Sequence, residues 1–443
     1  MLAKILKNPL LMQSLWSIIA RFVGVGLNFA VAILIAQKLP ESEAGMFLLL
    51  ITYVTGFALF SRIGLDQLLM KEVASAHEDD THFRSHFLRS SYKFIIILSI
   101  IFITFWLILS PLIREYSFDG EIELNYLLFA GIGILFYNFV ILNSTYLKAI
   151  QKTVIAVLSQ NALPATALII VLALFWNSFE LDQRYIYLYT FSLILAGSFA
   201  IYLTWSHLPS KADHLSGANQ LGFTHLFKKS LPLAPVAIFS FLMIFADTIM
   251  VSFFLPNSDV AYYNIAGRIS FVILFFLGAL EATIYPRLLN VYKHKQDQLH
   301  SFFWQSTALV IGIVLSVTVM MYLLSDWILL AFGENYVAGS QKSLGLLLIA
   351  QLLRAASITF SFMFIIREKV RYLNIILVLA LIINLVCNVI FIKMFGIEGA
   401  ALATLISNGV LLFSVLVLFM TNKLLTLPPQ QTTKKKDTGE QTA

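Results

Sequence analysis

The chain has 443 residues, of which 59% are hydrophobic and only 12% are charged. About a quarter of the residues of an ordinary soluble domain are charged, so this composition excludes a soluble globular protein and indicates an integral membrane protein. The formal net charge of +6 does not indicate a nucleic-acid partner, because the bases are spread over loops between apolar runs, and the single cysteine, Cys387, excludes an intramolecular disulfide.

Twelve apolar runs of about 20 residues are each long enough to cross a bilayer. They predict an all-α polytopic membrane protein with twelve transmembrane helices. The runs cover residues 12–36, 45–65, 92–113, 125–147, 153–176, 185–205, 230–254, 261–285, 303–324, 343–366, 372–392 and 398–420. The first run is too long for the apolar part of a cleavable signal, and we expect it to be a retained anchor.

A polar segment divides the predicted helices into two equal sets. We expect a six-helix bundle over residues 1–205, a cytoplasmic linker over 206–229, a second six-helix bundle over 230–422 and a disordered, lysine-rich tail over 423–443. Most of the 30 lysines and arginines fall near the N-terminus, in every second loop and in the tail. The positive-inside rule therefore places both termini in the cytoplasm.

Two stretches, 39–71 and 255–287, share one layout: a Leu-Pro turn with an acidic residue, then a long apolar helix that closes on a base. The matched pairs are Leu39 and Leu255, Pro40 and Pro256, Phe60 and Phe276, and Lys71 and Arg287. Their constant offset is close to half of the chain, which indicates a duplicated unit and two pseudo-symmetric bundles. Such repeats are typical of secondary transporters, whose substrate site lies between them.

Six charged residues fall inside the predicted spans, where burying an ionised group costs several kcal/mol, so each is a functional candidate. They are Arg21, Arg62, Asp247, Arg268, Glu281 and Arg354. Arginine stays charged when desolvated, and its planar fork suits phosphate. The four arginines therefore predict a cationic cavity for a phosphate-bearing substrate, and the two carboxylates are candidates for ion coupling or gating.

An ion-paired, structural role is the alternative for several of these charges. The sequence allows pairs of Asp247 with Arg268, of Arg62 with Asp66, and of Glu281 with Arg287 or Lys71. The first pair is favoured by equal depth on neighbouring antiparallel helices, and the second by one-turn spacing.

Motifs for a metal, a cofactor or catalysis are not evident. His82 and His86 have helical i,i+4 spacing, but no further ligands accompany them, so no metal site is predicted. The chain has no GxxxxGK[ST] loop for ATP. Its predicted outer loops are too short to shape an active site, and an enzyme is therefore not expected.

Several segments, in this order, resemble a known family. They are ALFSRIGLDQLLMKEVA (58–74), ADTIMVSFFL (246–255), SDVAYYNIAGRIS (258–270), YPRLL (285–289), LLAFGENYVAGSQKSLGLLLIAQ (329–351) and FGIEGAALATLISN (395–408). The ordered set resembles the polysaccharide-transport branch, in particular the Wzx-type O-antigen flippases, of the multidrug/oligosaccharidyl-lipid/polysaccharide exporter superfamily.

This resemblance implies two bundles around a central cavity that opens alternately to either side of a bacterial inner membrane. The substrate would be an undecaprenyl-diphosphate-linked oligosaccharide, such as an O-antigen unit of lipopolysaccharide, and the partners would include a polysaccharide polymerase and chain-length machinery. The bundles would rock about the 206–229 linker. Charged cavity residues matter in such flippases, and Arg21, Arg62, Asp247, Arg268 and Arg354 are the positions that would take this part.

Two alternatives remain open from the sequence. A drug or metabolite antiporter of the same superfamily is one, although a surplus of intramembrane arginines argues against cationic drugs. A membrane enzyme, such as a polysaccharide polymerase or a polyprenyl-phosphate glycosyltransferase, is the other, and it is less favoured because it needs a sizeable catalytic loop.

Overall fold

The computed structural model describes residues 9–76, 80–175, 184–208 and 222–421, and all regular secondary structure in these ranges is helical. Eleven helices in them are long and apolar enough to cross a membrane. A twelfth span forms if α8 (Thr153–Asn161) and α9 (Leu163–Phe175), which meet at an angle of 44°, are taken together. The prediction of a twelve-helix polytopic membrane protein is confirmed.

The first six spans are α2 (Pro9–Lys38), α3 (Glu41–Arg62), α5 (Thr81–Ser117), α6 with α7 (Leu124–Ala130, Ile132–Ala149), α8 with α9, and α10 (Tyr185–Trp205). The other six are α12 (Ala234–Phe254), α13 with α14 (Asn257–Ser270, Val272–His294), α15 (Leu299–Leu323), α17 (Glu334–Ile366), α18 (Val370–Phe395) and α19 (Ile397–Thr421). Shorter helices are α4 (Leu65–Ser75), α11 (Phe223–Ser230) and α16 (Ser325–Leu330), with 3-10 turns η2 (Leu231–Leu233) and η3 (Gln296–Gln298).

Local sequence explains where the spans break. Both predicted Leu-Pro turns separate helices, α2 from α3 at Pro40 and α12 from α13 at Pro256. Pro164 stands at the second position of α9, where its ring and missing N–H interrupt the helix that precedes it. After α3, the backbone of Ile63 and Gly64 is left-handed, with φ of 46° and 75°, and turns the chain into α4.

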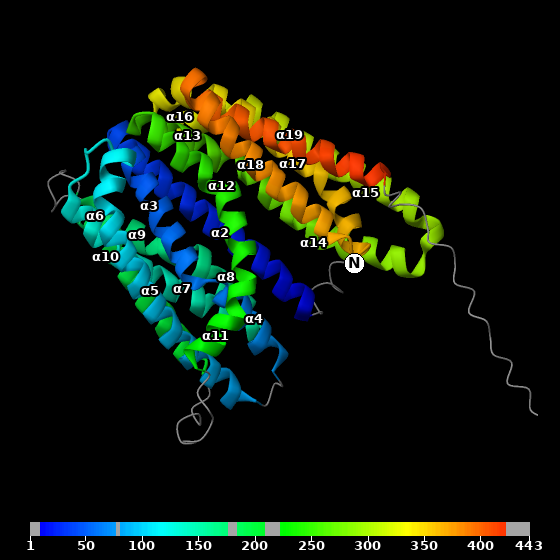
Figure 1. The fold of residues 1–443 in the computed structure, drawn as a ribbon, viewed down its shortest axis with the longest axis horizontal. Coiled ribbons are helices and arrows are strands. Elements are labelled where there is room, and N and C mark those ends of the chain that lie inside the picture. The colour runs from blue at the N-terminus through cyan, green and yellow to red at the C-terminus, as the bar shows by residue number, and fades with distance from the viewer. Residues whose placement is uncertain (1–8, 77–79, 176–183, 209–221, 422–443) are drawn as a thin grey trace, which may run out of the picture. The chain divides into compact units, whose positions relative to one another are not determined.

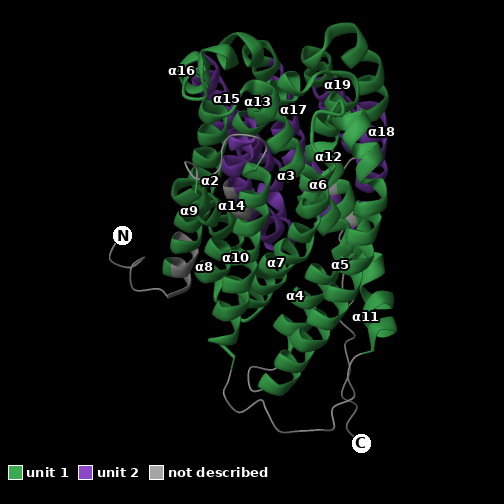
Figure 2. Ribbon diagram, turned by 90° about the vertical axis from the view of Figure 1, so that its left-hand side faces the viewer, with its two compact units in different colours: residues 1–269, 324–345, 385–403 green, residues 270–323, 346–384, 404–443 purple. Residues whose placement is uncertain are grey.

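The chain forms two compact units (Figure 2). Unit 1 holds the residues up to 269 together with 324–345 and 385–403, and unit 2 holds 270–323, 346–384 and the residues from 404 onward. These units do not follow the expected boundary at 206–229. The division into two six-helix bundles stays a prediction.

Within unit 1, α10 packs against α7 and α9, and α2 lies along α8 (Figure 1). A buried core joins α4, α5, α7 and α11, with Leu69, Phe94, Leu142 and Leu226 among its members. Helix α11, at the end of the predicted linker, is thus packed into this core, and Nζ of its Lys229 lies 3.2 Å from Oε1 of Glu72 on α4.

Large apolar side chains are exposed along whole helices. On α5 they include Ile97, Ile100, Ile101, Phe105 and Ile108. Contiguous apolar surface of this extent is unstable in water and is typical of a helix face in contact with lipid. The backbone groups of such a face are satisfied inside the helix, as a bilayer requires.

Candidate functional site

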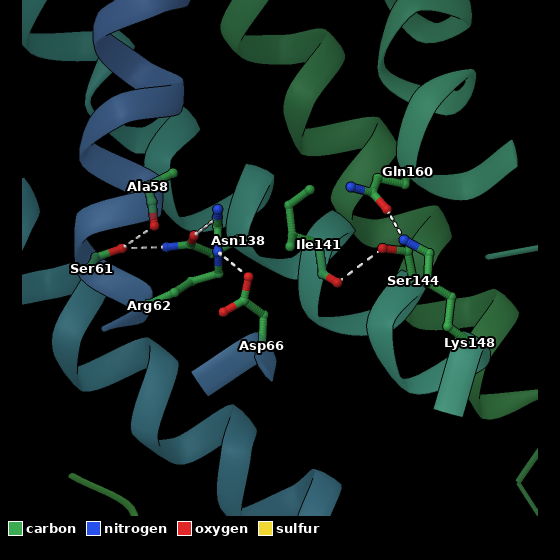
Figure 3. Close-up of polar contacts among 9 residues, drawn as sticks. All are labelled: Ala58, Ser61, Arg62, Asp66, Asn138, Ile141, Ser144, Lys148 and Gln160. Carbon is green, nitrogen blue, oxygen red and sulfur yellow. Dashed lines mark hydrogen bonds and ion pairs between the residues drawn. The ribbon is translucent and has the colours of Figure 1, made fainter. Parts of the chain in front are cut away.

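Arg62 lies at the C-terminal end of α3 and is only 5% exposed. Its Nη1 donates a hydrogen bond to Oδ1 of Asn138 on α7 at 2.8 Å (Figure 3). The Asn138 amide in turn donates to Ser61 Oγ at 2.7 Å and to Ser99 Oγ of α5 at 2.9 Å. The network therefore fixes the buried guanidinium between three helices.

Asp66 of α4 completes this group. Its Oδ2 lies 3.9 Å from Arg62 Nε, so the pair expected from one-turn spacing is confirmed. Two buried atoms of the pair, Arg62 Nε and Asp66 Oδ1, have no hydrogen-bond partner among the described residues. A buried donor and a buried acceptor left without partners are atoms that a bound polar ligand would satisfy.

Arg21 on α2 is exposed, in contrast to Arg62. Lys148, in the last turn of α7, lies within electrostatic range of Arg21 and also of Asp66. The Lys148 ammonium donates to the side-chain oxygen of Gln160 on α8 (Figure 3). The structure thus brings two cations from different helices, Arg21 of α2 and Lys148 of α7, within electrostatic range of one another.

Arg268, near the C-terminal end of α13, is half-buried. Its Nε donates to Oδ1 of Asn264 at 2.7 Å, and Tyr189 of α10 lies within electrostatic range. These partners are neutral.

Asp247 on α12 is 9% exposed and accepts hydrogen bonds from two neutral side chains. Its Oδ1 accepts a hydrogen bond from Asn388 Nδ2 of α18 at 2.7 Å, and its Oδ2 accepts one from the Tyr263 hydroxyl of α13 at 3.1 Å. The carboxylate therefore receives neutral donors from two other helices, all within unit 1.

In unit 2, Arg354 of α17 and Glu281 of α14 lie within electrostatic range of each other, and both are half-buried. The carboxylate near Arg354 is thus Glu281, the second of the two residues that the sequence suggests for ion coupling or gating.

The two Leu-Pro turns meet at one end of unit 1, in what we call the hairpin contact: Gln37, Glu41, Gly45, Glu121, Asn257, Ala331 and Asn335. Asn335 donates to Glu41, and Gln37 donates to the Ala331 carbonyl at 2.7 Å. Asn257 donates to Glu121 at 3.0 Å and to the Phe118 carbonyl at 3.3 Å. Helices from both halves of the sequence are bound together here by polar contacts.

Among the residues that the structure describes, no group of three or more His, Cys, Asp or Glu residues is placed to hold a metal ion. His82 and His86 lie on the first turns of α5.

Sequence reasoning did not single out Lys148 or Gln160 as site residues. Lys148 directly follows the predicted apolar run 125–147, so hydropathy leaves it just outside the span, whereas α7 extends to Ala149. Asn138, a polar residue in the middle of that run, was a signal of interhelical hydrogen bonding.

Comparison with known proteins identifies the family. The model of the family described as "Polysaccharide biosynthesis protein" matches residues 10–292. A "probable low-salt glycan biosynthesis flippase Agl15" of Haloferax volcanii is 24% identical over 88% of this chain and 79% of its own. An uncharacterized membrane protein of Methanocaldococcus jannaschii is 23% identical over 93% of this chain and 83% of its own.

Solved structures share the fold. A lipid II flippase MurJ in an inward closed conformation superposes with a TM-score of 0.72 at 15% identity, covering 94% of this chain and 88% of MurJ. An inward-facing multidrug resistance MATE transporter of the MOP superfamily gives a TM-score of 0.68 at 16% identity, covering 92% and 97% of the two chains. The fold is thus the one that these flippase and multidrug transporter structures share, and the chain belongs to the polysaccharide biosynthesis protein family and is a multi-pass membrane protein.

Proposed function

We propose that this protein is a flippase that moves a polyprenyl-diphosphate-linked oligosaccharide across the membrane by alternating access. The substrate would be an undecaprenyl-diphosphate-linked O-antigen or similar repeat unit. The family and the glycan flippase of Haloferax volcanii support this direction. Nothing in the proposal requires an enzyme activity or a cofactor.

The observation that carries the proposal is the surplus of positive charge within the spans. Arg62 is paired with one carboxylate, Asp66, whereas Arg268 donates a hydrogen bond to the neutral amide of Asn264, and Arg21 lies within electrostatic range of another base, Lys148. Maintaining such charges away from water is costly unless an anion compensates them. A diphosphate with its sugars is an anion of the required kind, and its prenyl chain stays in the lipid.

Within this proposal, Arg21, Arg62, Arg268 and Arg354 bind the headgroup, and their planar forks orient its phosphate oxygens. Asp247 and Glu281 are the residues for ion coupling or gating. Both oxygens of the Asp247 carboxylate accept hydrogen bonds from neutral donors on other helices, so a change in its charge would be felt by α13 and α18. Transport that is indifferent to both proton and sodium gradients would remove the coupling role.

The proposed location is the inner membrane of a bacterium, with both termini in the cytoplasm, beside a polysaccharide polymerase and chain-length machinery. The proposed arginines would bind a different polyprenyl carrier in the same way, since they recognise the diphosphate and not the prenyl chain.

The test is deletion of the gene in its host, followed by assay of surface polysaccharide and of the membrane side that holds the lipid-linked repeat unit. Intact single units on the cytoplasmic face, with loss of surface glycan, are the expected result. Complementation with Arg21→Ala and Arg354→Ala, singly and together, should restore little export at normal protein abundance. Single units on the outer face would indicate a polymerase, and unchanged glycan with altered drug sensitivity would indicate an antiporter.

A further inference from the structure

Lys148 is held in a way that is unusual for a lysine near the end of a span. Such lysines generally extend toward the aqueous interface. Lys148 is half-buried instead, and its ammonium donates to the amide oxygen of Gln160 on the next helix (Figure 3). Four residues further on, Lys152 is exposed. One lysine thus faces α8 while its neighbour faces outward.

The turn between α7 and α8 fixes this arrangement. Gln151 has a φ of 64°, and its N–H donates to the Lys148 carbonyl at 3.0 Å. The N–H of Lys152 donates to the Leu147 carbonyl at 2.8 Å. These two hydrogen bonds fix the backbone of the turn that follows Lys148. The Lys148 side chain then lies where α7 packs against α8.

Helix α2 is held against the same part of α8. A Cβ on Gly24 would lie 2.5 Å from Asn161 Cβ, so the two helices touch closely at this point. Asn28 bridges them, because its amide donates to the Gly24 carbonyl at 2.8 Å and to the Asn161 carbonyl at 2.9 Å. Arg21 lies about one turn before Gly24 on the same helix, and its charge is within electrostatic range of Lys148.

The charges of this group do not cancel. Arg21, Lys148 and Arg62 are three bases, and Asp66 is the carboxylate that interacts with Lys148 and Arg62. Two positive charges are left over. The headgroup of a polyprenyl diphosphate joined to a sugar carries one negative charge on each of its two phosphates, which matches this surplus.

We propose that Arg21 and Lys148 form a diphosphate-binding pair, in which Gln160 is a positioning residue that holds the Lys148 ammonium toward Arg21. This inference rests on the proposed function and adds to it a lysine and a positioning glutamine. The ligand class is a lipid-linked diphosphate, and free pyrophosphate is distinguished from it by the test.

The experiment measures binding of geranylgeranyl diphosphate and of inorganic pyrophosphate to the purified full chain. Lys148→Met removes the charge, Lys148→Arg keeps it, and Lys152→Met is the matched control. We expect Lys148→Met to weaken binding of the lipid diphosphate by about 10- to 100-fold, as loss of a charge-assisted hydrogen bond does. Lys148→Arg and Lys152→Met should stay within a few fold of the wild type.

Gln160→Glu separates binding from structure. The glutamate keeps a partner for Lys148 and preserves the size of the side chain, so a purely structural role would tolerate it. It also adds a negative charge beside the pair, so a binding role predicts a loss of affinity comparable with that of Lys148→Met. Thermal unfolding of each variant shows whether it is folded.

The outcomes differ in what they overturn. If Lys148→Met and Gln160→Glu bind like the wild type while Arg21→Ala loses affinity, the pair is wrong and the proposed flippase stands. If inorganic pyrophosphate binds as tightly as the lipid, the ligand class is wrong. If the wild type binds neither probe, diphosphate recognition by this group is wrong, and the sidedness assay then decides the flippase function separately.

Discussion

Gly45 lies in the second turn of α3, inside the hairpin contact, where no side chain has room. A Cβ there would lie 1.8 Å from the Asn257 carbonyl oxygen and 3.1 Å from the Ala261 nitrogen, both backbone atoms. For Gly45→Ala, α3 and α13 must separate until the closest distance rises from 1.8 Å to at least 3.4 Å, where ordinary contact begins. We therefore expect the substitution to open the hairpin contact.

The magnitude follows from three terms. Overpacking costs about 1–3 kcal/mol. Separation also removes the two hydrogen bonds of Asn257, at about 1 kcal/mol each. Alanine is about 1 kcal/mol more favourable than glycine inside a helix, and this gain offsets part of the cost. The net cost to the contact is about 2–4 kcal/mol, which shifts its equilibrium toward the open form by about 30- to 700-fold.

Hydrogen–deuterium exchange of the purified chain measures this shift. In Gly45→Ala, amides at the starts of α3 and α13 should exchange faster, and glycan export should fall. Gly26→Ala is the control, because a Cβ at that helical glycine meets nothing within 4 Å. If the two variants exchange alike at the hairpin contact, backbone proximity at Gly45 does not hold it closed and the reasoning is refuted.

Three further predictions concern polar contacts. Asn138→Leu removes the acceptor of the buried arginine on α3 and should destabilise the protein by about 2–4 kcal/mol, seen as a lower melting temperature in detergent; an unchanged melt contradicts the network. With the native cysteine replaced by serine, Glu41→Cys with Asn335→Cys should crosslink under oxidant and stop export until reduced; export by the crosslinked protein would show that the contact need not open. Arg354→Ala and Glu281→Gln should be less than additive in unfolding free energy, by about 0.5–3 kcal/mol, and strict additivity would deny their coupling.

Much of the fold follows from the sequence because the bilayer imposes length and polarity on each span. Apolar runs of about 20 residues located the helices, and Leu-Pro pairs located the two matching turns. The Arg62–Asp66 pair was predictable as well from the short spacing of the two residues, although they lie on either side of the turn between α3 and α4 and not on one helix face.

Depth along a helix does not determine which way a side chain points. Asp247 and Arg268 are level by residue count, yet Asp247 faces Tyr263 and Asn388, and Arg268 faces Asn264. Each residue turns the helix by about 100°, so partners depend on how the helices are rotated against one another, which hydropathy does not record.

The same limit explains the other differences. The sequence allows Glu281 to pair with Arg287 or Lys71, whereas the structure brings it within electrostatic range of Arg354, far along the chain. The apolar run 125–147 ends just before the charge of Lys148, although α7 continues past that residue to Ala149. Long-range pairing and side-chain direction both arise from tertiary packing.

The docking of α11 has a mechanical consequence. Leu226 anchors this short helix in the core with α4 and α5, and only the three residues of η2 separate it from α12. Gly64, at the start of α4, touches the same junction, since a Cβ there would lie 2.8 Å from the Ser230 oxygen and the Ala234 nitrogen. A displacement of α12 is therefore transmitted to α4 through this short junction of α11 and η2.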